Sequence, residues 1–495
     1  MNEPPGIRVD RARLRDGGRL GRPRRRPALL IAALLVSVTT GCTKPVALPI
    51  ASPTAPLAIG ALGPTFYVSQ AGSGADGRTW ATAWKDTSRI DWAVVPAGST
   101  IYLDGGSSRC SASPYDFAPS SPNPGVTCGT RYSPFTVGRN DITILRSTQR
   151  GHNGTVVIDG HRDTPLPYCH QHTYAAPAGA TYGIDFAGHS GVVIDGENRS
   201  GIIVRGARNG VNMGVGGHDT LANMELFDNG YPIPIRGGYN SDGNDILFNG
   251  PGNVYRRLLV HDGGQDEFHS ASSAVSESGS MIEDSWIGNL RENPLYPGHS
   301  FNGPESAGCK HVDGVQIFAP AKTLRGLTVS WVVFGPGLNQ GLYPSDGGTG
   351  TTFDDVTVED TLFLDAESHN VISDNRVTGW TLDHVTLFAT QGGSEIPGSG
   401  TIRMTDSIKF GGYWMTPGPT WSARNDIWFG GDSAPGLHES PGFVRSPGGT
   451  APRFAALESA DLRPTCRGCS GVGSPLPSWA SIFAHIDALN GGFSQ

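Results

Sequence analysis

The chain has 495 residues, of which 70 are Gly and 37 are Pro. Together these make up about 22% of the chain, below the roughly 25–30% that marks low-complexity disorder. Charged residues account for only 17%, which excludes a long charged coiled coil. At this length about three domains would be usual, unless the chain is one long solenoid built from repeats.

The first forty residues resemble an export signal. An Arg-rich start ends at Arg26 and leads into the apolar run 28–38, which only Ser37 interrupts. Eleven residues are too few to span about 30 Å of hydrocarbon as a helix, so residues 1–41 are interpreted as a signal peptide. The small residues before Cys42 resemble a bacterial lipobox, which implies a lipid on Cys42 and a membrane anchor. Ordinary signal cleavage nearby is the alternative.

Removal of the signal changes the charge balance. Residues 1–41 contain nine Arg and three acidic residues, so the chain from Cys42 onward carries 28 basic and 42 acidic residues, a net charge of −14. Nucleic-acid binding needs a basic surface, so it is not expected. Residues 42–63 are rich in Pro, Ala and Thr and are interpreted as a tether.

Seven cysteines are an odd number for an exported chain, and a lipidated Cys42 would leave six. In an oxidising compartment six cysteines can form three disulfides. We expect the pairs Cys110–Cys128, Cys466–Cys469 and Cys169–Cys309.

From Phe66 onward the chain consists of short β-rich runs separated by Gly, Asn and Asp, which predicts an all-β fold. The runs begin at Ile142, Val192, Val254, Met281, Leu327, Val356, Trp380 and Ile402. From Val254 their starts are 27, 46, 29, 24 and 22 residues apart. This period is typical of solenoid coils, with the 46-residue step being two coils or one coil with an insertion.

A second strand is predicted inside each coil, with an aliphatic residue pointing inward and its neighbours outward. The expected inner column is Ile184, Val211, Val275, Val315, Leu342 and Val371. The expected outer column contains Asp185, Asn212, Gln316 and Tyr343. A polar row lies two residues before the aliphatic: Asn209, Asp313, Gln340 and His369. Because Gly or Asn follows each of them and permits a left-handed bend, we expect this row to point outward and to be exposed. A β-sandwich is the competing architecture, but it would not repeat one motif in every coil.

Several segments resemble right-handed parallel β-helix proteins of the pectate-lyase-like superfamily. Residues 66–103 resemble the first coil and capping helix, residues 311–316 resemble a motif of secreted bacterial members, and residues 461–475 resemble the usual C-terminal close. The resemblance implies a right-handed parallel β-helix over residues 64–460. Residues 461–495 would form a closing segment, and the apolar stripe of 479–489 predicts a helix that covers the open end.

The densest polar cluster is 310–316, in which Lys310, His311 and Asp313 are candidate catalytic residues. The superfamily contains lyases, hydrolases, epimerases and binding proteins, so the activity stays open. A uronate lyase needs a base and a cation; Lys310 or His311 would be the base, and Asp313 with another outward acid would hold Ca²⁺.

An inverting glycosidase instead needs two carboxyls roughly 6.5–9.5 Å apart. The candidates are Asp313 with Asp346, Asp266 or Glu267. His369 is a further catalytic candidate. The candidate substrate contacts are Gln316, Gln340, Tyr343, Asp266, Glu267 and His269. The sequence therefore predicts an exported protein that acts on an extracellular polysaccharide, foremost a lyase on an acidic glycan, with a hydrolase or a binding protein as alternatives.

Overall fold

The computed structural model describes residues 63–110, 128–160, 180–235, 238–270, 277–288, 312–318, 323–335, 337–345, 352–364, 369–372, 376–388, 393–395, 400–410, 420–424, 426–429, 444–446, 471–476, 478 and 481–491. Cys42, the proposed tether except its last residue, and the cysteines at 169, 309, 466 and 469 lie outside these residues. Within the described part, no helix combines the length and the apolar character that crossing a bilayer requires.

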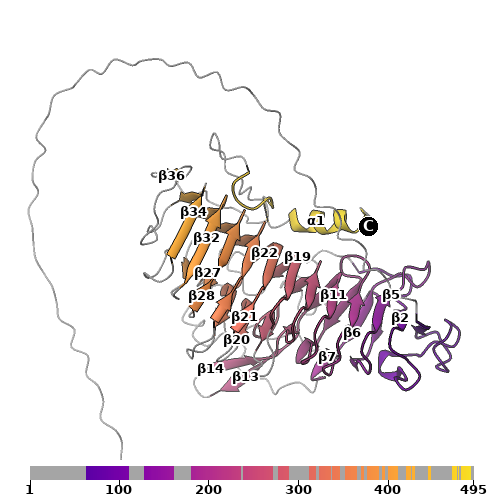
Figure 1. The fold of residues 1–495 in the computed structure, drawn as a ribbon. Coiled ribbons are helices and arrows are strands. Elements are labelled where there is room, and N and C mark those ends of the chain that lie inside the picture. Colours follow the sequence, from indigo (N-terminus) through magenta and orange to yellow (C-terminus); the bar gives the residue numbers. More distant parts are fainter. Residues whose placement is uncertain are drawn as a thin grey trace, which may run out of the picture. The chain divides into compact units, whose positions relative to one another are not determined.

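Most strands belong to one large parallel sheet, here called sheet A (Figure 1). Its strands are β1 (Thr65–Val68), β2 (Thr100–Leu103), β3 (Thr130–Tyr132), β5 (Thr143–Arg146), β6 (Val156–Asp159), β8 (Val193–Asp195), β9 (Ile202–Arg205), β11 (Thr220–Ala222), β12 (Met224–Phe227), β16 (Val254–Arg256), β17 (Leu259–His261), β19 (Met281–Gly288), β22 (Thr328–Phe334), β25 (Thr357–Glu359), β26 (Leu362–Leu364), β29 (Trp380–Asp383), β30 (Thr386–Phe388), β32 (Thr401–Thr405), β33 (Ile408–Phe410), β34 (Thr420–Arg424), β35 (Ile427–Phe429) and β36 (Val444–Ser446).

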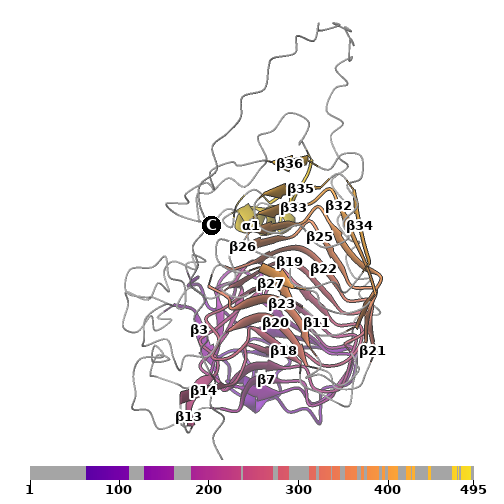
Figure 2. The same cartoon turned by 90° about the vertical axis from the view of Figure 1, so that its left-hand side faces the viewer.

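A second parallel sheet, sheet B, takes one further strand from most coils (Figure 2). Its strands are β4 (Phe135–Thr136), β7 (Tyr182–Asp185), β10 (Asn209–Asn212), β15 (Ile246–Leu247), β18 (Phe268–Ser270), β20 (Asp313–Phe318), β23 (Gln340–Ser345), β27 (His369–Ile372) and β31 (Gly393–Glu395). The smaller elements are the hairpin β13 (Tyr231–Ile235) and β14 (Gly238–Asp242), the sheet β21 (Thr323–Arg325), β24 (Thr352–Asp354) and β28 (Arg376–Thr378), the 3₁₀ turn η1 (Thr87–Arg89), and the helix α1 (Ser481–Leu489).

In sheets A and B the equivalent strands of successive coils pair in parallel, in register except for a shift between β27 and β31, which makes the fold a parallel β-helix, as predicted. In sheet A, one continuous column of fully buried apolar residues follows this register: Phe66, Ile101, Ile144, Ile194, Leu221, Tyr255, Ile282, Val329, Val358 and Leu382. A slip of one residue would move this whole column to the outside, so burial fixes the register.

In seven coils a single left-handed residue turns the chain within sheet A, either between two short strands or inside the long strands β19 and β22. The seven corner residues, with φ between 48° and 55°, are Asn223, Arg257, Asp284, Trp331, Asp360, His384 and Asp406. Non-glycine residues adopt this conformation rarely. Its repetition at one place in seven coils shows that the corner is a fixed element of the coil rather than a local irregularity.

The register settles two of the predictions about coil spacing. The 46-residue step is one coil with an insertion, because β19 pairs directly with β22. The inner column of sheet B is Phe135, Ile184, Val211, Ile246, Phe268, Val315, Leu342 and Val371. The register leaves no position for Val275 in this column, because Phe268 pairs directly with Val315; Val275 itself lies outside the described residues.

The C-terminal helix α1 lies against the flank of the solenoid and does not cover its open end, so that expectation was wrong (Figure 1). Its buried residues Ile482 and Ile486 join an outward apolar cluster on sheet A that includes Trp286. His485 Nε2 lies 2.8 Å from Asp284 Oδ1, and the ring of His485 stacks on Trp331 at 4.4 Å between centroids. The apolar outer face of these strands explains why the helix binds here.

At the N-terminal end, the first coil forms as predicted from β1 and β2. The expected capping helix is only the 3₁₀ turn η1 within the described residues of this coil. Farther along the chain, the predicted disulfide Cys110–Cys128 is present. Both cysteines pack on the outward side of sheet A beside Val157, Ile203 and Phe227.

We expect the double substitution Cys110→Ser and Cys128→Ser to lower the free energy of unfolding by about 3 kcal/mol, because a disulfide that closes a loop of this length restricts the unfolded chain. The two cysteines are 18 residues apart. Urea unfolding of the double variant and of the wild type measures the difference. Equal midpoints would show that the loop is held by other contacts.

Candidate functional site

The outer surface of sheet B carries one straight row of side chains, here called the ledge. It consists of Thr136, Asp185, Asn212, Leu247, His269, Gln316 and Tyr343. The register thus confirms the predicted outer column and adds Thr136, Leu247 and His269 to it. His269, Gln316 and Tyr343 occupy three consecutive strands and are all partly exposed, so they can contact one extended ligand.

A buried carboxylate orients the imidazole on the ledge. Asp266 Oδ2 lies 2.8 Å from His269 Nδ1. The side chain of His269 is 14% exposed, whereas that of Asp266 is 1% exposed. Because the carboxylate accepts the Nδ1–H hydrogen bond, the second ring nitrogen Nε2 is left as the proton acceptor. The pair therefore has the composition of an oriented general base.

Asp266 also belongs to a ladder of side chains that runs inside the corner before sheet B. Asn209 Oδ1 accepts a hydrogen bond from Asn244 N at 3.1 Å, and Asn244 Oδ1 accepts one from Asp266 N at 3.1 Å. Asp266 Oδ1 in turn accepts one from Asp313 N at 3.2 Å. Each side chain thus satisfies a backbone donor of the next coil. The ladder fixes the position of Asp266 and, through it, of His269.

The predicted polar row exists, but its described side chains, those of Asn209, Asp313 and Gln340, are buried. Asp313 pairs with Gln340 and Gln340 with His369 in the strand register. The expected bend was wrong, because Asp313 begins the continuous strand β20 and Gly314 is not among the residues with a left-handed φ. The expected exposure was wrong as well. Asp313 is fully buried, and Gln340 is 9% exposed.

Asp313 makes contacts within the protein rather than with solvent. Its backbone N–H donates to Asp266 Oδ1 at the end of the ladder, and its Oδ1 accepts a hydrogen bond from Asn339 Nδ2 at 3.4 Å. A carboxylate that is covered in this way does not fit the expected calcium site or a group that touches substrate. The side chain of His369, and the whole of Lys310, His311 and Asp346, lie outside the described residues.

Glu267 faces a second carboxylate rather than the ledge. Glu267 and Asp245 are both fully buried, and both contact the space beside Gly263, where a Cβ would lie 3.0 Å from Glu267 Oε2 and 3.2 Å from Asp245 Oδ2. Burial raises the pKa of both carboxyls, and the mutual charge of the pair raises the pKa of Glu267 further. The expectation that Glu267 binds substrate therefore does not fit its position.

Beside this acid pair lies a buried histidine that bridges two further carboxylates. His261 Nδ1 lies 2.9 Å from Asp262 Oδ2, and His261 Nε2 lies 3.2 Å from Glu225 Oε1. Its ring is stacked between Phe227 and Trp286. Burial alone would lower the pKa of His261, but the hydrogen bonds and charges of Asp262 and Glu225 raise it to about 9. The imidazole is therefore a buried cation at neutral pH.

The sequence offered only a weak signal for this network. Asp262 and Asp266 lie in a short acidic segment between strands, and such segments are usually solvated loops. Finding Asp245 opposite Glu267 requires knowing that Ile246 and Phe268 occupy neighbouring positions of the inner column. Both strands are only two or three residues long, too short for their alternation to be recognised.

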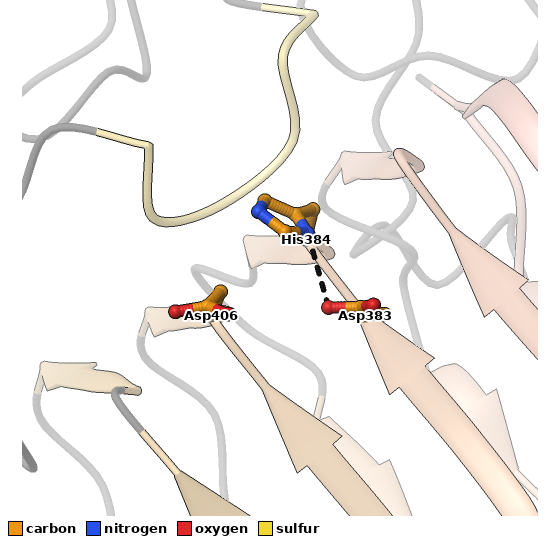
Figure 3. A group of neighbouring side chains, drawn as sticks. All are labelled: Asp383, His384 and Asp406. Carbon is orange, nitrogen blue, oxygen red and sulfur yellow. Dashed lines mark ion pairs between the residues drawn. The ribbon is translucent and has the colours of Figure 1, made fainter. Parts of the chain in front are cut away.

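One group of described residues has the spacing of a metal site, at the left-handed corner of sheet A that contains His384 and Asp406 (Figure 3). Asp383, His384 and Asp406 each offer one ligand atom, all within 4.8 Å of one another. His384 Nδ1 lies 3.0 Å from Asp383 Oδ1. The imidazole suits a transition metal better than Ca²⁺, which prefers oxygen ligands. On the ledge, the described residues form no such group of three.

Comparison with solved structures gives several similar chains at low sequence identity. A rhamnogalacturonan lyase aligns with a TM-score of 0.45 and 12% identity over 84% of this chain and 96% of its own. Pectate lyase Pel9A aligns with a TM-score of 0.40 and 11% identity over 85% and 90%. The catalytic unit of an α-1,3-glucanase from Streptomyces thermodiastaticus aligns at 0.33 and 11% over 70% and 64%. No protein-family model and no curated protein matches the chain.

We expect alkaline pH to destabilise the protein. The pKa of His261 is raised from 6.5 to about 9 in the fold, so its contribution is present in full below pH 6.5 and is lost as the pH rises to about 9. The raised pKa values of Asp245 and Glu267 act in the same direction. Over this range the free energy of unfolding should fall by about 3 kcal/mol from His261 alone.

Urea unfolding at a series of pH values tests this expectation. His261→Gln should flatten the loss between pH 6.5 and 9, whereas the control His218→Asn changes an exposed histidine and should keep the wild-type slope. Equal slopes in all three proteins would show that His261 is not charged in the folded state.

Proposed function

We propose that this protein is a polysaccharide-active enzyme, and specifically a lyase that cleaves an acidic glycan by β-elimination. The observation that carries the proposal is the Asp266–His269 pair on the ledge. An oriented imidazole that reaches the surface supplies the base which removal of a proton from C5 of a uronate requires. The ledge supplies a row of contacts for a chain-like substrate.

In the proposed reaction, His269 Nε2 takes the C5 proton while Asp266 keeps the Nδ1 proton in place. The electrons of the broken C–H bond form the C4–C5 double bond, the C4–O bond breaks, and the leaving oxygen receives a proton from water. Gln316 and Tyr343 follow His269 on the next two strands, about 4.8 Å apart per step. They would bind the adjoining sugar units.

The negative charge of a uronate substrate needs a neighbouring cation, and the ledge side chains do not provide one. The ledge contains Asp185 but neither Lys nor Arg, and the processed chain would carry a net charge of −14. A bound Ca²⁺ would neutralise the uronate carboxylate and acidify its C5 proton. We therefore propose that activity depends on Ca²⁺ and is lost with a chelator.

A glycoside hydrolase has less support from the geometry. That reaction needs two carboxyls that reach the glycosidic bond. The carboxyls of Asp266, Glu267 and Asp313 are at most 1% exposed. A hydrolase or a binding protein without activity thus remains an outcome of the experiment rather than the proposal.

The test is a screen of the purified protein on uronic-acid and neutral polysaccharides. We expect absorbance of unsaturated uronate products from at least one uronate polymer. His269→Gln should lower turnover by about 10²-fold or more. Asp266→Asn should lower it less, because the imidazole stays in place but loses the carboxylate that orients it. His218→Asn is the matched control.

The readout separates the alternatives. Reducing ends without the unsaturated product would indicate a hydrolase, and saturable binding without either product would indicate a binding protein. Wild-type turnover in His269→Gln would remove His269 from the reaction and overturn the mechanism.

We further propose that the protein is exported and anchored through a lipid on Cys42. The support is the arginine-rich start, the apolar run 28–38 and the small residues before Cys42. Inhibition of lipoprotein signal peptidase, or Cys42→Ala, should move the protein out of the membrane fraction or leave it uncleaved. A wild-type protein that is wholly soluble and begins at another residue would contradict this proposal.

A further inference from the structure

A cavity of about 450 Å³ lies at the N-terminal end of the ledge, next to η1, β4 and β7. Two ledge residues, Thr136 and Asp185, line it together with the aromatic side chains of Trp92 and Tyr182. The proposed reaction uses none of these residues. Binding sites for small molecules are typically concave spaces of this size with aromatic walls and a few polar groups.

Hydrogen bonds hold the wall of the cavity in place. Asp86 accepts hydrogen bonds from Ser88 N at 2.9 Å and from Ser133 N at 3.1 Å. The hydroxyl of Thr87 donates to the carbonyl oxygen of Ser133. These bonds tie η1 to the segment before β4, so the cavity is formed without a ligand and binding would require little ordering of the protein.

The Trp92 side chain packs against the backbone of Gly138, where there is no room for a larger residue. A Cβ at that position would lie 2.4 Å from Trp92 Cγ. The indole is partly buried and packs against the core, while the rest of it lines the cavity. A large aromatic surface that is fixed at a cavity wall can cover the apolar face of a sugar ring.

The polar groups of the cavity favour a neutral, hydroxyl-rich ligand. Its hydroxyls include those of Ser88 and Thr136, and Asp185 is the single charged residue among those that line it. Asp185 Oδ1 is held by Asn212 Nδ2 at 2.9 Å and by Ala187 N at 3.0 Å. A carboxylate accepts hydrogen bonds from sugar hydroxyls and repels the carboxylate of a uronate.

We infer that this cavity is a subsite for a neutral sugar unit of the polysaccharide, and this inference rests on the proposed function only in taking the ligand to be a glycan. Asp185 and His269 are separated by three strand steps of sheet B, about 14 Å at the usual spacing. A glycan bound along the ledge would therefore place a neutral unit in the cavity while another unit lies at His269.

The test is binding of defined hexasaccharides of glucose, xylose, galactose and galacturonate, measured by calorimetry with the His269→Gln variant so that no ligand is consumed. We expect at least one neutral hexamer to bind. Trp92→Ala should weaken its Kd at least about tenfold, because it removes the stacking surface. Thr136→Tyr should have a similar effect by filling the cavity from an exposed strand position, without removing a core contact.

Trp80→Ala is the matched control. Trp80 is also a partly buried tryptophan of the first coil, but its ring stacks on His152 at 4.0 Å and lies outside the cavity lining. Its Kd should stay within about twofold of the parent value. Thermal melts of all variants separate loss of binding from loss of folding, and Thr136→Tyr keeps the test valid if Trp92→Ala is unstable.

The inference is overturned if no neutral hexamer binds, if only the galacturonate hexamer binds, or if Trp92→Ala and Thr136→Tyr both bind as the parent does. Failure of the proposed function has a different signature. In that case the wild type would produce no unsaturated uronate from any polymer, while neutral hexamers would still bind in a Trp92-dependent manner.

Discussion

The in-register parallel pairing of successive coils is the constraint on which every other feature depends. An inward apolar side chain at the same position of each coil fixes that register, because a slip by one residue would expose the entire column. The same register brings residues that are dozens of positions apart in sequence into one straight row. His269, Gln316 and Tyr343 form a ledge for this reason alone, and none of them needs a specific contact with the others to be aligned.

The corner between the two sheets departs from the apolar rule of the interior. Glu225, Asp245, His261, Asp262 and Glu267 are almost completely buried there. Isolated charges would be too costly at such positions. Here the cost is offset because the imidazolium of His261 lies between two carboxylates and the remaining acid pair favours protonation. Removing one partner would leave an uncompensated charge, so this corner tolerates substitution less than the apolar columns do.

The fold could be predicted from the sequence because its strand pattern repeats in every coil. The site could not, because a side chain's role there depends on whether other segments bury it. The spacing of the runs and the Gly-aliphatic motif were sufficient for the β-helix and for most of both columns. Ile246 and Phe268 were missed because their strands are short, and Val275 was chosen in their place. Asp313 was assigned to the correct row but to the wrong side of the strand, because its burial depends on which atoms of other segments cover it. In the same way, the apolar stripe of α1 indicated a buried face but not its partner.

The docking site of α1 has a consequence for the order of assembly. Residues near the end of the chain bind the middle of the solenoid, where Asp487 contacts Arg199 from 288 positions away. Until α1 has been synthesised and has docked, the outward apolar surface around Trp286 has no cover. The coils can stack in the order of their synthesis, but the apolar outer face of these strands stays exposed until α1 binds. Docking of α1 therefore covers a surface that would otherwise favour aggregation, and a chain without α1 would keep that surface exposed.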